Sequence, residues 1–153
     1  QYYSIDKNRI GVFGCSAGGH LALMAAYAPK RQNHPKSIKA AVAFCPLTDL
    51  SELEVAFVVQ YLGCVLEEQP ETFAKASPIT YTKRSVPTLL VHGARDRTVP
   101  IRQSIKLARL LSQNSTRVEL VQLPEEDHMF SLKNCSERVA ALKYLVAFFQ
   151  ETL

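Results

Sequence analysis

Residues 14–18 read Gly14-Cys15-Ser16-Ala17-Gly18, which sets a serine between two glycines. The apolar run 10–13 precedes this stretch, and a second apolar run, 21–26, follows it. This context predicts a strand, a tight turn and a helix, with the serine in the turn. Glycine has no Cβ, so it permits the strained turn that lifts a serine hydroxyl clear of a sheet. The pattern therefore predicts a nucleophile elbow centred on Ser16.

The same pattern has a second explanation, in which Ser16 only caps the following helix and the glycines serve an ordinary turn. The two explanations differ in what else the chain must contain. A nucleophilic serine needs a histidine base, and the base needs an acid that holds its tautomer. A catalytic serine also needs an N–H group that donates to the oxyanion formed in the reaction. We expect the backbone N–H of Ala17, at the helix start, in this role.

An aspartate and a histidine follow later strands in a suitable order. Asp96 comes after the apolar run 86–91, and His128 comes after the apolar run 118–123. The carboxyl ends of parallel strands meet at one edge of a sheet, so these side chains are expected near Ser16. Ser, then Asp, then His is the order typical of this elbow. We therefore predict Ser16, Asp96 and His128 as the catalytic residues.

Each of these partners has a plainer alternative. Asp96 could be a turn residue, and His128 could be an exposed loop histidine like others in the chain. Asp49, which follows another apolar run, is a rival for the acid. Asp127 is a weaker rival, because it is too close in sequence to His128 to reach the ring easily from behind.

Alternating strands and helices predict a parallel α/β sheet with helices on both faces. The expected strands lie near 10–13, 40–45, 88–91 and 118–123, and their continuous apolar character suits burial on both faces. Helices are expected at 18–27, 52–62, 101–113 and 136–149, with a short turn at 70–76. One stripe of the last helix is expected to face the core, made of Val139, Leu142, Leu145, Val146 and Phe149.

With these motifs in place, the chain resembles the C-terminal half of an α/β-hydrolase, in the acetyl-esterase and lipase branch. The stretches that carry the resemblance are 5–12, 14–22, 76–81, 88–100 and 127–130. The resemblance implies a nucleophile at Ser16, an acid at Asp96 and a base at His128. The H-G-x-x-D-x-x-V-P setting of residues 92–100 favours Asp96 over Asp49.

One departure from the family pattern lies beside the predicted base. Many relatives carry small residues before this histidine, whereas residues 125–127 are Glu125-Glu126-Asp127. These carboxylates either act on His128 electrostatically or face solvent.

The family fold has a larger sheet than the four strands expected here. The resemblance therefore implies a single domain, residues 1–153, that lacks its N-terminal half, including the H-G-G type loop that supplies the second oxyanion donor. The strand at Ile10–Phe13 would then form an apolar edge, which favours self-association through that edge.

The longest stretch between predicted strands is 47–85, and we expect it to form an insertion over the site. Five apolar residues there could line an acyl pocket or form a lid: Leu53, Val55, Phe57, Val58 and Leu62. The favoured alternative is an ordinary helix packed on the sheet. In either case, this segment would govern substrate choice more than the catalytic residues do.

Composition narrows the function further. A chain of 153 residues with 47% hydrophobic residues suits one domain with a sizeable core. The net charge of +4 is spread along the chain without a basic stripe, which argues against nucleic acid, and no apolar run approaches a membrane span. Four cysteines without metal-type spacing predict free thiols and favour a cytoplasmic location.

The sequence therefore predicts a serine hydrolase that cleaves small-molecule carboxylic esters of small or medium acyl groups. The reaction passes through an acyl-enzyme and needs no metal or cofactor. Two alternatives stay open. One is a peptidase or formamidase on the same fold, and the other is a non-catalytic truncated fragment that needs a partner.

Overall fold

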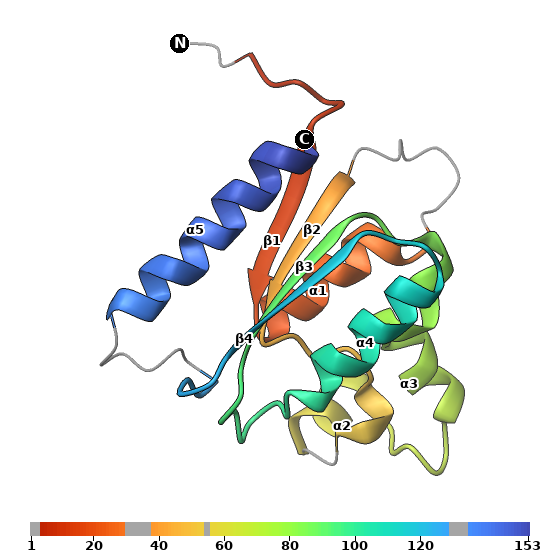
Figure 1. Ribbon diagram of the computed structural model, residues 1–153. Coiled ribbons are helices and arrows are strands. Elements are labelled where there is room, and N and C mark those ends of the chain that lie inside the picture. The colour runs from red at the N-terminus through yellow and green to blue at the C-terminus, as the bar shows by residue number, and fades with distance from the viewer. Residues whose placement is uncertain (1–3, 30–37, 54–55, 129–134) are drawn as a thin grey trace.

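The computed structural model describes residues 4–29, 38–53, 56–128 and 135–153. Its strands are β1 (Ile10–Cys15), β2 (Ile38–Phe44), β3 (Thr88–Gly93) and β4 (Val118–Leu123). They form one sheet in the order β1-β2-β3-β4, and every neighbouring pair is parallel. The predicted α/β fold class is confirmed, because helices cover both faces of this parallel sheet (Figure 1).

The two faces of the sheet bury separate apolar clusters. Along β2, Val42 packs toward helix α5 (Cys135–Thr152), whereas its neighbours Ala41 and Ala43 pack toward α1 (Ala17–Tyr27) and α4 (Arg102–Gln113). This alternation follows from the two-residue period of a strand. Residues 40–44 and 88–93 are buried throughout, which explains why β2 and β3 read as continuous apolar runs.

The face that α5 buries differs from the predicted stripe. Leu145 and Phe149 pack against the core as expected, but Val139, Leu142 and Val146 are 46%, 52% and 49% exposed. The helix instead buries Ala141 and Phe148. Apolar residues surround much of this helix, so periodicity alone does not single out one stripe. The large aromatic rings gain most from burial, and their packing decides which side faces the sheet.

The connection between β2 and β3 contains four short elements: η1 (Leu50–Glu52), α2 (Ala56–Leu62), α3 (Pro70–Ala76) and η2 (Pro78–Arg84). The expected single helix over 52–62 is wrong in its first part. Asp49 caps η1 by accepting a hydrogen bond from the Ser51 N–H, and Leu53 then turns to extended backbone. The extended backbone at Leu53 therefore ends this 3₁₀ turn before α2 begins.

Cys15, Cys45 and Cys64 are free thiols, and of these Cys15 is exposed while the other two are buried. Within the described segments, no helix is both long and apolar enough to cross a membrane.

Candidate active site

Ser16 lies in the turn between β1 and α1 with φ 53° and ψ −122°. A positive φ is costly for a residue with a side chain, so the surroundings must hold it in place. The Ser16 N–H donates to the Phe44 carbonyl at 2.7 Å, and a Cβ at Gly14 would overlap the backbone of Gly18. The turn therefore closes only because residue 14 is a glycine and β2 anchors the serine.

The structure brings the three predicted residues into one chain of hydrogen bonds. The Ser16 Oγ lies 2.8 Å from His128 Nε2, and His128 Nδ1 lies 2.7 Å from Asp96 Oδ2. A carboxylate only accepts, so Nδ1 carries the hydrogen and Nε2 accepts from the serine hydroxyl. The Ser16 side chain makes no capping bond to α1, so the alternative of a simple helix cap is wrong.

The Asp96 carboxylate has a dense set of donors. Its Oδ1 accepts from the backbone N–H groups of Thr98 at 2.9 Å and Val99 at 2.8 Å. Burial raises the pKa of Asp96, but hydrogen bonds from His92, Val99 and His128 outweigh that effect and hold the pKa well below its usual range. The carboxylate is therefore ionised at neutral pH.

Neither rival aspartate takes this place. Asp49 caps η1 and pairs with Lys106 Nζ at 2.7 Å, so its carboxylate has a local structural role. The ring nitrogens of His128 face Ser16 and Asp96, which leaves no ring nitrogen for Asp127.

The loop that carries His128 is fitted closely against the end of β3. The Ala94 N–H donates to the Leu123 carbonyl and the Arg95 N–H to the Glu126 carbonyl, both at 2.9 Å. A Cβ at Gly93 would overlap that Glu126 carbonyl, so this approach requires glycine. These bonds tie the Asp96 loop and the His128 loop together.

Of the acidic residues before His128, Glu125 and Glu126 differ in their exposure to solvent. Glu125 is exposed and pairs with Arg95, whereas Glu126 is a buried residue with 1% of its surface exposed. The expectation that these carboxylates face solvent therefore holds for Glu125 but not for Glu126.

Ala17 is the first residue of α1 and directly follows Ser16. The first N–H groups of a helix have no acceptor in a preceding turn. The Ala17 N–H is therefore available, by helix geometry, to a negatively charged oxygen near the Ser16 hydroxyl.

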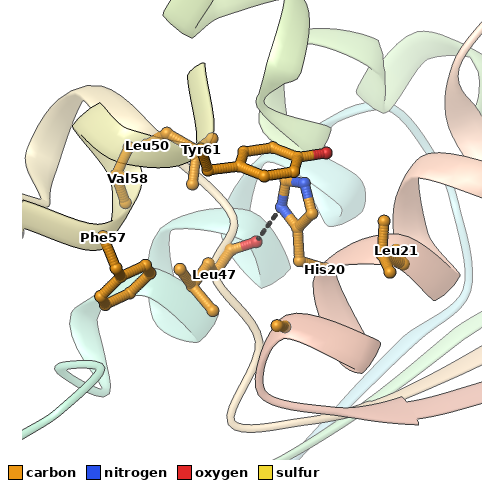
Figure 2. A pocket seen from close by; sticks show the side chains of 8 residues that line it. His20, Leu21, Leu47, Leu50, Phe57, Val58 and Tyr61 are labelled. Carbon is orange, nitrogen blue, oxygen red and sulfur yellow. Dashed lines mark hydrogen bonds between the residues drawn. The ribbon is translucent and has the colours of Figure 1, made fainter. Parts of the chain in front are cut away.

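An apolar cavity of about 210 Å³ opens beside the elbow (Figure 2). Its lining comprises Ala17, His20, Leu21, Leu47, Leu50, Phe57, Val58 and Tyr61. The buried His20 ring donates from Nδ1 to the Leu47 carbonyl at 3.1 Å, and burial lowers the pKa of His20, so the ring stays neutral at neutral pH. The cavity therefore offers an uncharged surface next to the serine.

Helix α2 contributes to this cavity through Phe57, Val58 and Tyr61. Val58 also belongs to a third apolar cluster with Leu47, Leu50, Leu53, Cys64, Phe73 and Val99, none of which lies in a strand. The favoured expectation of a helix packed on the sheet is therefore wrong for α2. Val55 lies outside the described residues.

Sequence reasoning missed His92, which is fully buried with its Nε2 3.2 Å from Asp96 Oδ2. His92 lies near the end of β3 and four residues before Asp96, and this spacing was the sequence signal that could have indicated a contact between them. Ligand-type atoms of Cys45, His92 and Asp96 all lie within 4.8 Å of one another, so this group could present ligands to a metal ion. In the structure, the His92 and Asp96 atoms instead hydrogen-bond to protein groups.

Residues 1–111 match the BD-FAE family. Esterase LipC of Mycobacterium tuberculosis is 33% identical over 162 residues, covering 94% of this chain and 40% of LipC. Dipeptidyl peptidase family member 2 of Caenorhabditis elegans is 30% identical over 130 residues, covering 84% of this chain and 15% of that protein. The chain therefore spans less than half the length of these curated relatives, which include both an esterase and a peptidase.

Among solved structures, dipeptidyl peptidase 4 of Porphyromonas gingivalis has a TM-score of 0.84 at 21% identity. The alignment covers 97% of this chain and 20% of that chain. This likeness bears on the fold alone.

Proposed function

The chain belongs to the BD-FAE family of α/β-hydrolases, and from this membership and the Ser16 hydrogen bonds we propose that it cleaves carboxylic esters of small or medium acyl groups. The observation that carries the proposal is the hydrogen-bonded series from Ser16 Oγ through His128 to the ionised Asp96. Such a series activates a serine for attack on an acyl carbon.

The proposed reaction begins when Ser16 Oγ attacks the ester carbonyl while His128 Nε2 takes the hydroxyl proton. The Ala17 N–H donates to the oxyanion of the tetrahedral intermediate. His128 then returns the proton to the leaving alcohol, and an acyl-enzyme remains on Ser16. Water, deprotonated by His128, then attacks the acyl carbon. The acyl–Oγ bond breaks, the acid leaves, and His128 returns the proton to Ser16 Oγ. Asp96 stays ionised throughout and stabilises the imidazolium.

The size and polarity of the cavity support a small or medium acyl group. Its volume of about 210 Å³ is below the range of typical drug-sized ligand pockets, which begin at about 300 Å³. Its lining is mainly apolar and includes Ala17, the proposed oxyanion donor. A short acyl chain placed there would bring its carbonyl next to Ser16.

Peptide bonds are the second candidate substrate, because a dipeptidyl peptidase is 30% identical over 84% of this chain. The same nucleophile, base and acid serve ester and amide cleavage. Turnover of p-nitrophenyl acetate and butyrate, compared with that of dipeptide p-nitroanilides, distinguishes the two. We expect the esters to be cleaved and the anilides to be cleaved much more slowly.

Covalent labelling tests the nucleophile directly. A fluorophosphonate probe should label the chain at Ser16, and Ser16→Ala should abolish both labelling and ester turnover. Ser112→Ala, a change at an exposed serine on α4, is the matched control and should retain both. Labelling that persists in Ser16→Ala overturns the assignment. A folded wild-type chain that neither labels nor turns over ester favours the alternative of a non-catalytic fragment.

A further inference from the structure

We propose that His92 is a positioning residue that holds the Asp96 carboxylate in the orientation in which it directs His128 toward Ser16. The inference rests on the proposed function, because it concerns the same site. His92 contacts no residue of the apolar cavity lining through a hydrogen bond, so it acts through Asp96.

The His92 ring is fixed on both sides. Its Nε2 lies 2.8 Å from the Val99 carbonyl, and a carbonyl only accepts, so Nε2 carries a hydrogen. The same Nε2 lies 3.2 Å from Asp96 Oδ2. On the opposite side, Nδ1 lies 2.7 Å from Ser104 Oγ, whose hydroxyl donates to it in the neutral ring. These contacts define one tautomer and one ring orientation.

The two oxygens of Asp96 are held by different kinds of donor. Backbone N–H groups of Thr98 and Val99 hold Oδ1. Among the described residues, the side-chain nitrogens that face Oδ2 belong to His128, at 2.7 Å, and His92. In the proposed reaction, His128 transfers the proton, whereas the fully buried His92 has its hydrogen bonds and close charged contact with Ser104, Val99 and Asp96 rather than with Ser16. His92 therefore supplies Oδ2 with a donor that stays in place during the reaction.

Cys45 is a further titratable group packed against this pair. Its sulfur lies within 4.8 Å of the ligand-type atoms of His92 and Asp96. Burial raises the pKa of the Cys45 thiol, and Asp96 raises it further, so the thiol stays neutral. A neutral thiol is a weak donor and cannot replace an imidazole N–H.

Removing the His92 donor should loosen one of the two carboxylate oxygens while leaving the cavity intact. A misplaced Asp96 would allow the His128 ring to turn away from Ser16, and small displacements of catalytic groups are costly. We therefore expect His92→Leu to lower kcat by about 10-fold to 100-fold with KM changed by less than about twofold.

Two further variants separate positioning from support of the fold. His92→Gln keeps an N–H donor near the Nε2 position and should recover most of the lost kcat. Ser104→Ala removes one of the two bonds that orient the ring but leaves the bond from Nε2 to the Val99 carbonyl, so it should lower kcat less than His92→Leu does. The proposal is overturned if His92→Leu keeps wild-type kcat, or if a folded His92→Gln recovers none. It is also overturned if, in all three variants, the loss of kcat follows the decrease in unfolding temperature, because a purely structural role would give that result.

A proton NMR measurement tests the same inference without catalysis. The His128 Nδ1 hydrogen shared with Asp96 should give a low-field signal in the wild-type chain and in His92→Gln, and this signal should be lost or broadened in His92→Leu. An unchanged signal in His92→Leu overturns the positioning role. A wild-type chain that shows the signal but is not labelled at Ser16 contradicts the proposed function, while the NMR comparison still decides the role of His92.

Discussion

The Asp96 carboxylate is buried and yet ionised, because histidine and backbone donors surround it. Its pKa in the folded chain lies below the value of 3.8 that the free side chain has. Between the folded and unfolded values, the unfolded chain binds more protons than the folded chain. The free energy of unfolding must therefore fall as the pH falls through this window.

We predict that replacing Asp96 with Asn removes this part of the acid sensitivity. The difference in free energy of unfolding between wild type and Asp96→Asn should be constant near neutral pH and should change once the pH falls below about 4. Below that value, the change approaches about 1.4 kcal/mol for each pH unit. Denaturant unfolding at several pH values between 7 and 3 measures it. A difference in free energy of unfolding that stays constant down to pH 3 would contradict the hydrogen-bond pattern around Asp96.

At the scale of the elements, α2 and the turn before it supply much of the cavity wall. Leu47, Leu50, Phe57, Val58 and Tyr61 all come from the connection between β2 and β3. We propose that this connection, residues 47–85, selects the acyl group. Selection by a connecting segment agrees with the general rule that binding residues lie on loops that a rigid sheet positions.

Phe57→Ala is predicted to shift the preference toward longer acyl chains, because it removes a ring from the cavity wall. Each additional methylene that the cavity accepts is worth about 0.8 kcal/mol, or about fourfold in relative kcat/KM. The ratio of octanoate to acetate p-nitrophenyl ester turnover measures the shift. Val59→Ala, on the same helix but outside the lining, should leave the ratio unchanged. Equal shifts in both variants would argue against a role for α2 in acyl selection.

At the scale of the whole molecule, β1 lies at one end of the sheet order, and Phe13 on this strand is 43% exposed. Helix α5 lies beside this strand (Figure 1), and its residues Val139, Leu142 and Val146 are exposed. An edge strand beside an apolar helix surface favours pairing with another chain. We propose that this region is the one through which the 153-residue chain self-associates.

Phe13→Lys should weaken that association, because a charge at an edge strand opposes edge-to-edge pairing. Sedimentation velocity across a range of protein concentrations gives the dissociation constant, and we expect the variant to raise this constant at least tenfold. Ile105→Lys changes a similarly exposed apolar residue on α4, away from β1, and serves as the control. A wild-type chain that stays monomeric at high concentration would contradict the proposal.

Local patterns in the sequence predicted the strands and placed Ser16, Asp96 and His128 at one edge of the sheet, while the preference for Asp96 over Asp49 came from the family resemblance. Buried parallel strands need continuous apolar runs, and a tight strand-to-helix turn needs glycine near its serine. Both features therefore depend on residues that are close together in the sequence. Parallel strands also bring their carboxyl ends together whatever the side chains between them.

Only the tertiary structure decided the burial of His92 beside Asp96, the face that α5 turns to the sheet, and the place of α2 in the cavity wall. Each depends on packing between segments far apart in the chain. Packing selects among side chains that have similar hydrophobicity, and a buried polar group depends on partners from other segments. Neither choice leaves a local pattern in the sequence.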